Sequence, residues 1–257
     1  MRLSRRTFMK TAAIGGSVLA VGKLGLGRAQ AAAPNNTGPI IYVGTGRFEL
    51  VELGDAGDVS GLSALQLEED AIAKDILRMQ RPEDGAWDPR GNGNYALYFV
   101  TTASISPLMN SRLWRLTFDG IEQPEAGGRI DILLTNTPGR MFDNVTIDRL
   151  GRLFLQEDTG NNPWVAKIWV YGIDSGSLLE VAHHDPQFFE PGGAFFLTQD
   201  DESSGIIDAH DIFGQGWFLI DVQVHRVSAD PELVQGGQLL AMYVPPIASL
   251  DSREAAS

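Results

Sequence analysis

The sequence contains no cysteine among its 257 residues. A fold that depends on disulfide bonds is therefore excluded, and no metal can be bound through a thiolate. The sequence also lacks the Gly-x-Ser-x-Gly turn of α/β-hydrolases and the His-Glu-x-x-His helix of zinc proteases. With only four histidines, the chemistry of any metal site falls mainly to carboxylate and amide oxygens.

A run of about 20 apolar residues, the length that a membrane-spanning helix needs, is also absent. Residues 1–31 instead combine a basic head, SRRTFMK, a short glycine-rich apolar stretch and the small-residue exit AQA. This order is typical of a secretory signal, and the Arg5-Arg6 pair resembles the twin-arginine export motif. We therefore expect a signal peptide over residues 1–31 and a periplasmic or secreted product with no stable membrane anchor after cleavage. A Sec signal or an uncleaved anchor is the alternative.

Basic residues are scarce beyond this predicted signal. Six of the 20 lysines and arginines lie in residues 1–31 but none of the 33 acidic residues does, which leaves 14 basic residues and a formal charge of −19. Such a chain repels nucleic acid and anionic lipid, so we expect neither as a partner. It attracts divalent cations, although an acidic surface is also common in proteins that bind none.

Glycine is frequent, at 29 residues, and most of the chain consists of short apolar segments separated by Gly, Asp, Asn and Pro. This pattern predicts an all-β fold. The exception is the stretch of residues 61–80, where apolar residues recur at helical spacing and predict one short N-terminal helix that begins near Ser60 or Ser63. We predict a single domain over residues 32–257.

Three similar units follow one another along the chain. They begin with RPEDGAWDP at Arg81, MFDNVTIDR at Met141 and DDESSGIID at Asp200, at spacings of 60 and 59 residues. Each unit contains an acidic-polar pair, an Asp, a Gly-bearing turn and two further apolar strands. This period predicts the blades of a β-propeller. Three to four blades do not close a typical ring, so we expect an incomplete propeller, either shortened or completed by a second copy of the chain.

The repeat predicts how the acidic residues lie relative to one another. Glu83, Asp143 and Glu202 are equivalent in the three units, and Asp84 and Asn144 follow the first two of them. Because the innermost strand of each blade lines the channel of a propeller, these side chains are expected to face one another there. Calcium takes six to eight oxygen ligands, which such a set supplies. We therefore predict a calcium site, and exclude a structural zinc site for want of sulfur and imidazole.

Other residues are weaker candidates. Glu157 and Asp158 end a strand, and we include Glu157 among the predicted ligands, whereas Asp158 fits a simple polar turn equally well. Arg81 and Arg112 are candidates for bidentate contacts with a phosphate group. For His225 two positions are open, the channel and the core, of which we favour the core.

Several motifs together resemble the PhoX-type secreted alkaline phosphatases and their relatives. They are RPEDGAWDP, FDNVTIDRLGRLFLQEDTG, LTQDDESSGIID and GWFLIDVQVH, and the resemblance spans about residues 61–246. It implies a twin-arginine-exported β-propeller that hydrolyses phosphomonoesters with calcium, at an iron–calcium centre in the channel. The family's propeller is considerably longer, however, and its iron is held by a cysteine that this sequence does not have.

Two principal hypotheses follow for function. The first is an exported phosphatase for small phosphorylated substrates, which uses Ca²⁺ and, as a second candidate, Fe³⁺. The alternative is a non-catalytic binding or structural module that calcium stabilises. A third hypothesis, a truncated product that never completes its fold, predicts that no compact species forms.

Overall fold

The computed structural model describes most of the chain between Thr45 and Leu250, and four residues before it. The described residues are 19–22, 45–91, 95–102, 104–105, 108–109, 111–135, 137–230, 232, 234–247 and 250. The predicted signal over residues 1–31 lies outside them, apart from the backbone of strand β1 (Leu19–Gly22). Within the part of the chain that the structure describes, no helix is long and apolar enough to cross a membrane.

The chain divides into two compact units, each of which is described by itself. The first unit comprises Met1–Pro34, Gly44–Arg78 and Thr117–Ile130, and the second comprises Asn35–Val43, Met79–Leu116 and Asp131–Ser257. Strands β7 (Arg112–Phe118) and β8 (Gly128–Leu134) begin in one unit and end in the other. The single domain over residues 32–257 stays a prediction.

In the first unit, strand β2 (Thr45–Glu52) pairs with β1 in the order β1-β2-β8-β7, and a short 3-10 helix η1 (Pro124–Ala126) precedes β8. The predicted helix is observed as α2 (Ala64–Ala73). It begins at Ser63, whose hydroxyl accepts a hydrogen bond from the backbone N–H of Gln66 in a capping box. It ends earlier than predicted because Asp75 adopts a positive φ of 55°, which a helix does not accommodate.

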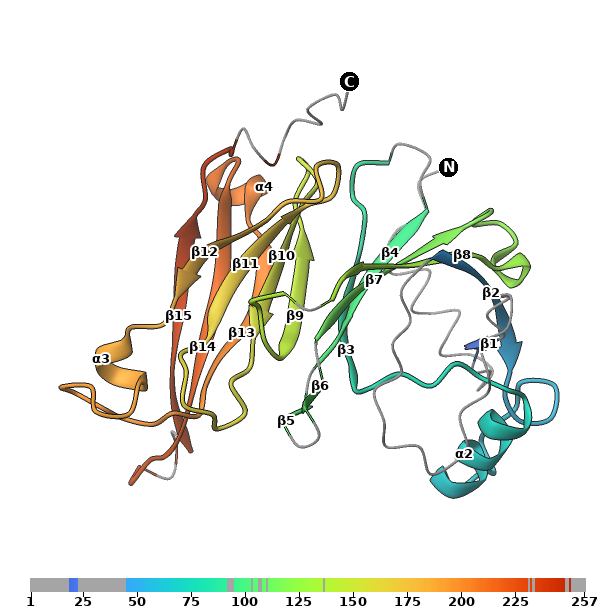
Figure 1. Ribbon diagram of the computed structural model, residues 1–257, viewed down its shortest axis with the longest axis horizontal. Helices are drawn as coiled ribbons and strands as arrows, with labels where there is room; N and C mark the ends of the chain where they lie inside the picture. Colours follow the sequence, from blue (N-terminus) through green and yellow to red (C-terminus); the bar gives the residue numbers. More distant parts are fainter. Residues whose placement is uncertain are drawn as a thin grey trace. The chain divides into compact units, whose positions relative to one another are not determined.

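The described part of the second unit contains three larger sheets, one two-stranded sheet and short connecting elements. The first sheet has the order β8-β7-β4-β3, the second β12-β11-β10-β9 and the third β13-β14-β15 (Figure 1). Their remaining strands are β3 (Pro82–Trp87), β4 (Ala96–Thr101), β9 (Phe142–Ile147), β10 (Arg152–Glu157), β11 (Lys167–Gly172), β12 (Leu178–His183), β13 (Asp201–Asp208), β14 (Trp217–Val227) and β15 (Gln235–Tyr243). The short elements are β5 (Ser104–Ile105), β6 (Leu108–Met109), α3 (Pro186–Phe189) and α4 (His210–Phe213).

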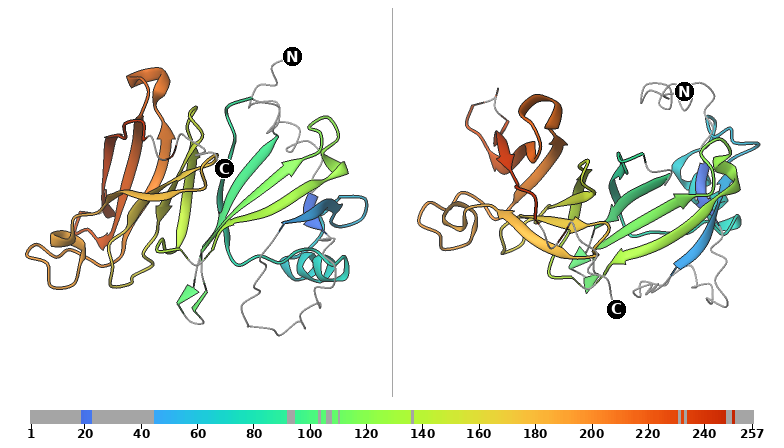
Figure 2. Two further views of the ribbon diagram at one scale, coloured as in Figure 1. Left: turned by 45° about the horizontal axis from the view of Figure 1, so that its top comes forward. Right: turned by 90° about the horizontal axis from the view of Figure 1, so that it is seen from above.

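Each of the three sheets corresponds to one repeat of the sequence. The first strand of each repeat forms one edge of its sheet, and these edge strands lie side by side, β3 next to β9 and β9 next to β13. Figure 2 shows the same succession of sheets in the second unit from two other directions. This is the strand order of propeller blades. The prediction of an all-β, propeller-like fold with few helices is confirmed.

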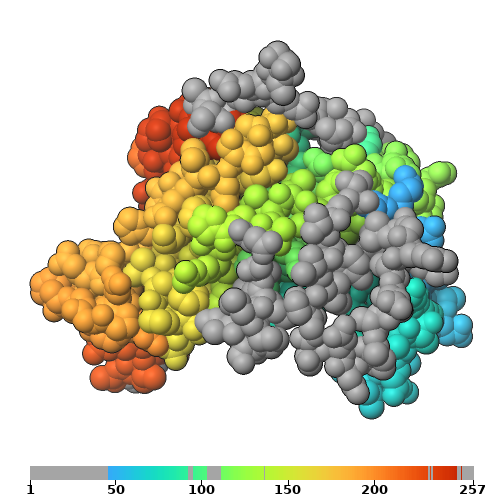
Figure 3. Space-filling model, in the orientation of Figure 1, coloured from blue at the N-terminus to red at the C-terminus, as the bar shows by residue number. Residues whose placement is uncertain are grey.

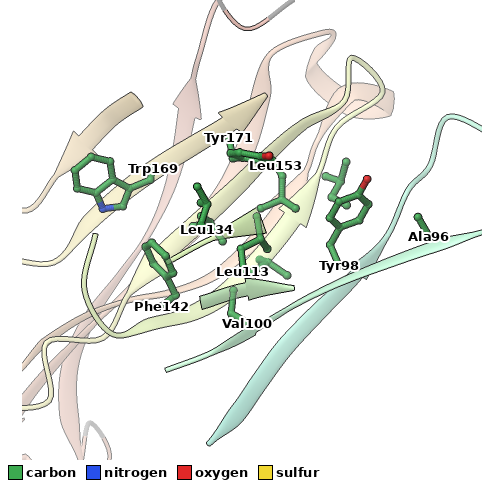
Figure 4. Packing of buried hydrophobic residues seen from close by; sticks show 12 residues of the cluster. Ala96, Tyr98, Val100, Leu113, Leu134, Phe142, Leu153, Trp169 and Tyr171 are labelled. Atoms are coloured by element: carbon green, nitrogen blue, oxygen red, sulfur yellow. The ribbon is translucent and has the colours of Figure 1, made fainter. Parts of the chain in front are cut away.

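Two apolar clusters hold these sheets together. The first lies between the first and second sheets and includes Tyr98, Leu113, Phe142, Leu153 and Tyr171 (Figure 4). The second lies between the second and third sheets and is centred on Phe154 and Phe218, whose rings are 4.2 Å apart. Burial of two such layers supplies most of the favourable free energy of folding.

The repeat also appears in the turns. The carboxylates of Asp88, Asp148 and Asp208 each accept a hydrogen bond from the backbone N–H two residues further on. This local bond favours a tight turn, which explains why each repeat carries an Asp at this point. The Asp of each repeat therefore shapes a turn.

Candidate metal centre

Bulges interrupt the innermost strands at the acidic pairs that the sequence singled out. Strand β3 carries one extra residue at Glu83-Asp84 relative to β4, and β9 carries one extra residue at Asp143-Asn144 relative to β10. The third edge strand, β13, has its irregularity at Gly205, slightly further along. Bulges are frequent next to active sites because they redirect side chains.

The bulge in β9 decides which way its polar residues point. Phe142 and Val145 both belong to the first apolar cluster, although strict alternation would place them on opposite faces. The extra residue lets Asp143 and Asn144 remain partly exposed between them. The polar pair thus faces away from the core while the strand on either side of it stays buried.

The residue before each of these strands has an uncommon backbone conformation. Arg81 and Met141, which are equivalent in the repeat, have positive φ angles of 40° and 46°. Non-glycine residues adopt this region rarely and at a conformational cost of order 1–3 kcal/mol, typically where the surrounding structure fixes a functional geometry. The backbone that leads into the acidic pair therefore has a similar conformation in the first two sheets.

Three carboxylates converge at the inner strands. Asp143 on β9, Asp158 directly after β10 and Glu202 on β13 place carboxylate oxygens within 4.8 Å of one another, and all three residues are partly buried. The backbones of Asp158 and Glu202 are joined by an antiparallel bridge, which fixes the end of the second sheet to the third. We call Asp143, Asp158 and Glu202 the carboxylate cluster.

The electrostatics of this cluster favour a bound cation. Burial, together with the charges of Glu202, Glu83 and Asp158, raises the pKa of Asp143 to about 7 against the opposing charge of Arg81. At neutral pH a bound cation would therefore stabilise the ionised form of Asp143 by neutralising the negative charge around it. An all-oxygen donor set of this kind fits Ca²⁺ or a similar hard cation, with amides, carbonyls or water completing the coordination.

The other predicted ligands lie at different places. Glu83 forms an ion pair with Arg81 at 3.4 Å and adds negative charge near Asp143 without joining the cluster. One Asp84 oxygen accepts a hydrogen bond from the backbone N–H of Val145 at 3.0 Å, so this side chain ties β3 to β9. Asn144 lies on β9 next to Asp143 and is partly exposed like it.

Glu157 lies apart from the cluster, in a buried site. It is 1% exposed, and its Oε1 accepts hydrogen bonds from the backbone N–H of Arg140 and the indole N–H of Trp169, both at 2.7 Å. Burial raises its pKa to about 7 although both hydrogen bonds lower it. Its position is explained by a structural role at the end of the second sheet.

The two predicted phosphate-binding arginines differ in setting. Arg81 is about half exposed and its charge acts on Asp143, so it lies within electrostatic reach of the carboxylate cluster. Arg112 opens strand β7, and burial lowers the pKa of its guanidinium. Phosphate binding by either arginine stays a prediction.

A solved structure shares this fold. The structure of Pseudomonas fluorescens PhoX in complex with vanadate, a transition state analogue, matches 77% of this chain and 41% of the PhoX chain, with 15% sequence identity and a TM-score of 0.51. This likeness to PhoX shows the fold, and the chain spans less than half the length of PhoX. No family model matches the sequence. No curated protein matches it either.

Two residues at the carboxylate cluster were undervalued from the sequence. Asp158 belongs to the cluster, and the signal for it was alternation, because Glu157 points into the core beside Trp169 and its neighbour must face the other way. His225 is partly exposed, and its Nε2 lies 3.1 Å from Glu202 Oε2 while its Nδ1 lies 3.0 Å from Gln235 Oε1. Burial lowers the pKa of His225, but these two bonds and the charges of nearby acids raise it by more.

The raised pKa of Asp143 predicts how the metal-free protein responds to pH. Since its pKa is about 7 in the folded chain and about 3.8 when unfolded, the folded state binds more protons between these values. We therefore expect stability to fall as pH rises from 5 to 8. Urea unfolding of the metal-free protein at several pH values measures this slope.

Asp143→Asn is expected to reduce that slope without abolishing it, because Glu157 and His225, whose pKa values are also raised, titrate with the same sign. The matched control is Asp230→Asn, which removes one charge from an exposed loop and is expected to leave the slope unchanged. A stability that rises with pH in the wild-type protein over this range would contradict the assignment.

Proposed function

We propose that this chain is a calcium-dependent phosphomonoesterase that acts outside the cytoplasm. The observation that carries the proposal is the convergence of Asp143, Asp158 and Glu202 on the inner strands of a fold shared with PhoX, whose solved complex contains vanadate as a transition state analogue. Vanadate stands in for a phosphoryl group during transfer, so a phosphorylated substrate is the natural class to test here. Twin-arginine export to the periplasm, or secretion, is part of the proposal and rests on the N-terminal sequence.

The acidic and basic residues of the site would have different roles. Asp143, Asp158 and Glu202 would hold the cation, which when bound supplies charge neutralisation at the phosphate and polarises its P–O bonds. Arg81, half exposed beside Glu83, would contact the phosphate oxygens through its planar guanidinium. His225 would keep Glu202 in place through its hydrogen bond. Fe³⁺ is the second candidate ion, and separate loading with each metal distinguishes the two.

One observation favours a second function, that of a calcium-stabilised binding or structural module. Two cluster carboxylates belong to the second sheet and one to the third, so a cation between them would join neighbouring blades. Such an ion stabilises the protein whether or not a reaction occurs. A second copy of the chain is a candidate partner for the exposed, uncharged strand β15, which has the sequence QGGQLLAMY.

Hydrolysis of p-nitrophenyl phosphate by the purified chain tests the catalytic proposal. We expect turnover in the presence of Ca²⁺, its loss on addition of chelator, and a decrease of about 100-fold in kcat/KM for Glu202→Gln because a ligand charge is lost. For Arg81→Ala we expect a rise of about tenfold in KM, because a phosphate contact is removed.

Glu122→Gln, an exposed acid of the first unit, serves as the control with the same change of charge. A folded protein that calcium stabilises but that shows no turnover would support the second function over the first. Turnover that chelator leaves unchanged would contradict both.

A further inference from the structure

A cavity of about 710 Å³ opens in the second unit, away from the carboxylate cluster. It lies between the segment that follows β12, which includes α3, and one face of strands β14 and β15. This segment is the orange projection at the left of Figure 3. The volume of the cavity is in the range of sites that bind small organic ligands. We call this cavity the α3 cavity.

Most of its wall is apolar. Val222 and Val224 of β14 contribute to it and continue the face of Phe218 and Ile220, which belong to the second apolar cluster. Leu240 of β15 and three residues of the α3 segment line it as well: Phe188, Phe189 and Leu197. A ligand that fills this space therefore needs an apolar body.

One buried polar group lacks a partner in this wall. His184 is 9% exposed, and its Nδ1 lies 2.6 Å from Oδ2 of Asp201, which is itself fully buried. The opposite ring nitrogen, Nε2, is buried and has no hydrogen-bond partner among the described residues. Because nearly all buried polar atoms are hydrogen-bonded, this nitrogen points to a partner from outside the chain.

The charges around the cavity favour an anionic partner. Arg226 lines it, and its guanidinium carries a positive charge. Among the described residues that line the cavity, the one acid is Asp185, which caps α3 by accepting a hydrogen bond from the backbone N–H of Gln187. Because Asp201 accepts at Nδ1, a carboxylate at His184 Nε2 requires a proton on both ring nitrogens and would then give the ring an acceptor on each side.

We propose that the α3 cavity binds an amphiphilic carboxylate, with its aliphatic chain against Val222, Val224 and Leu240 and its head group at His184 and Arg226. This site is separate from the carboxylate cluster, because β13 and β14 have two faces. Asp201 faces His184 whereas Glu202 belongs to the cluster, and Val224 faces the cavity whereas His225 contacts Glu202.

Calorimetric titration of the purified protein with sodium octanoate tests the proposal, and 1-octanol and propionate are the comparison probes. We expect saturable binding of one octanoate, binding of 1-octanol at least tenfold weaker because it lacks the charge, and no detectable binding of propionate because it lacks the chain. His184→Gln is expected to weaken octanoate binding about tenfold or more, and Arg226→Gln about threefold.

His183→Gln is the matched control, because His183 is about half exposed and already bonded to Glu180. We expect it to change octanoate affinity less than twofold. If His184→Gln does not fold, NMR of the wild-type imidazoles replaces it, with the expectation that octanoate shifts the Nε2 signal of His184. Absence of saturable octanoate binding would overturn the proposal. So would equal affinity for 1-octanol, full affinity in a folded His184→Gln protein, or an unmoved His184 signal.

Discussion

Addition of 1 mM Ca²⁺ to the metal-free protein at pH 8 is expected to raise its Tm by about 5–10 °C. For a Kd on the order of 10 µM, binding to the folded state alone contributes about 2.7 kcal/mol. For a chain of this size, 1 kcal/mol corresponds to about 2–4 °C. The cause is the relief of repulsion among Asp143, Asp158 and Glu202, whose carboxylate oxygens lie within 4.8 Å of one another. Differential scanning calorimetry measures the shift.

Two opposite effects are expected in a single variant at this site. Asp143→Asn removes the partly buried carboxylate whose pKa is raised to about 7, so the metal-free protein should become more stable at pH 8. The same change removes a ligand, so the calcium-induced shift should fall to less than about 2 °C. Glu122→Gln, an exposed acid, should show the full wild-type shift. An unchanged calcium shift in Asp143→Asn would place the ion elsewhere.

Arg152→Met is expected to lower the free energy of unfolding by about 3 kcal/mol. The Arg152 side chain is fully buried, and its Nε donates to Asp148 Oδ2 at 2.7 Å. Its Nη1 donates to the carbonyl oxygens of Val244 and Pro245, at 3.1 and 2.6 Å. The substitution leaves the carboxylate of Asp148 buried without its counter-ion and frees the segment after β15 from the second sheet. Urea unfolding measures the loss.

The double variant Asp148→Asn/Arg152→Met separates these two contributions. Replacing the unpaired carboxylate of Asp148 with an amide should restore about 1–2 kcal/mol of the free energy of unfolding relative to Arg152→Met alone, since a neutral amide is less costly to bury. The lost bonds to Val244 and Pro245 remain lost in both proteins. Additive effects of the two substitutions would show that the ion pair contributes little and that packing explains the loss.

The sequence was sufficient to predict the blades because their signals are local and repeated. An Asp before each turn, a Gly near it and an alternating strand after it recur every 60 residues or so, and each belongs to a short stretch of chain. Equivalent positions then placed Asp143 and Glu202 on neighbouring inner strands. That part of the candidate site follows from counting residues within the repeat.

The remaining part of the site depends on contacts between residues far apart in the chain. Glu157 is drawn into the core by the indole N–H of Trp169 on the next strand, which leaves Asp158 to join the cluster. Asp84 is held by the backbone of Val145, 61 residues away. Alternation predicts that Glu157 and Asp158 face opposite ways, but these distant contacts decide which of them faces the core. The single extra residues in β3 and β9 also redirect side chains in a way that alternation does not predict.

Strand β13 carries Asp201 and Glu202 in succession, one toward His184 and the other toward the carboxylate cluster. A slip of β13 by one residue against β14 would exchange their faces, as it does for any strand. After this exchange each of the two sites would still receive one carboxylate, on a side chain that is longer or shorter by a single methylene group. The two sites therefore tolerate a misregistered third sheet better than its apolar residues do. A chain folded in that register would keep one carboxylate at each site but would lose the packing of its apolar residues. Its unfolding would be less cooperative, while its calcium binding would remain.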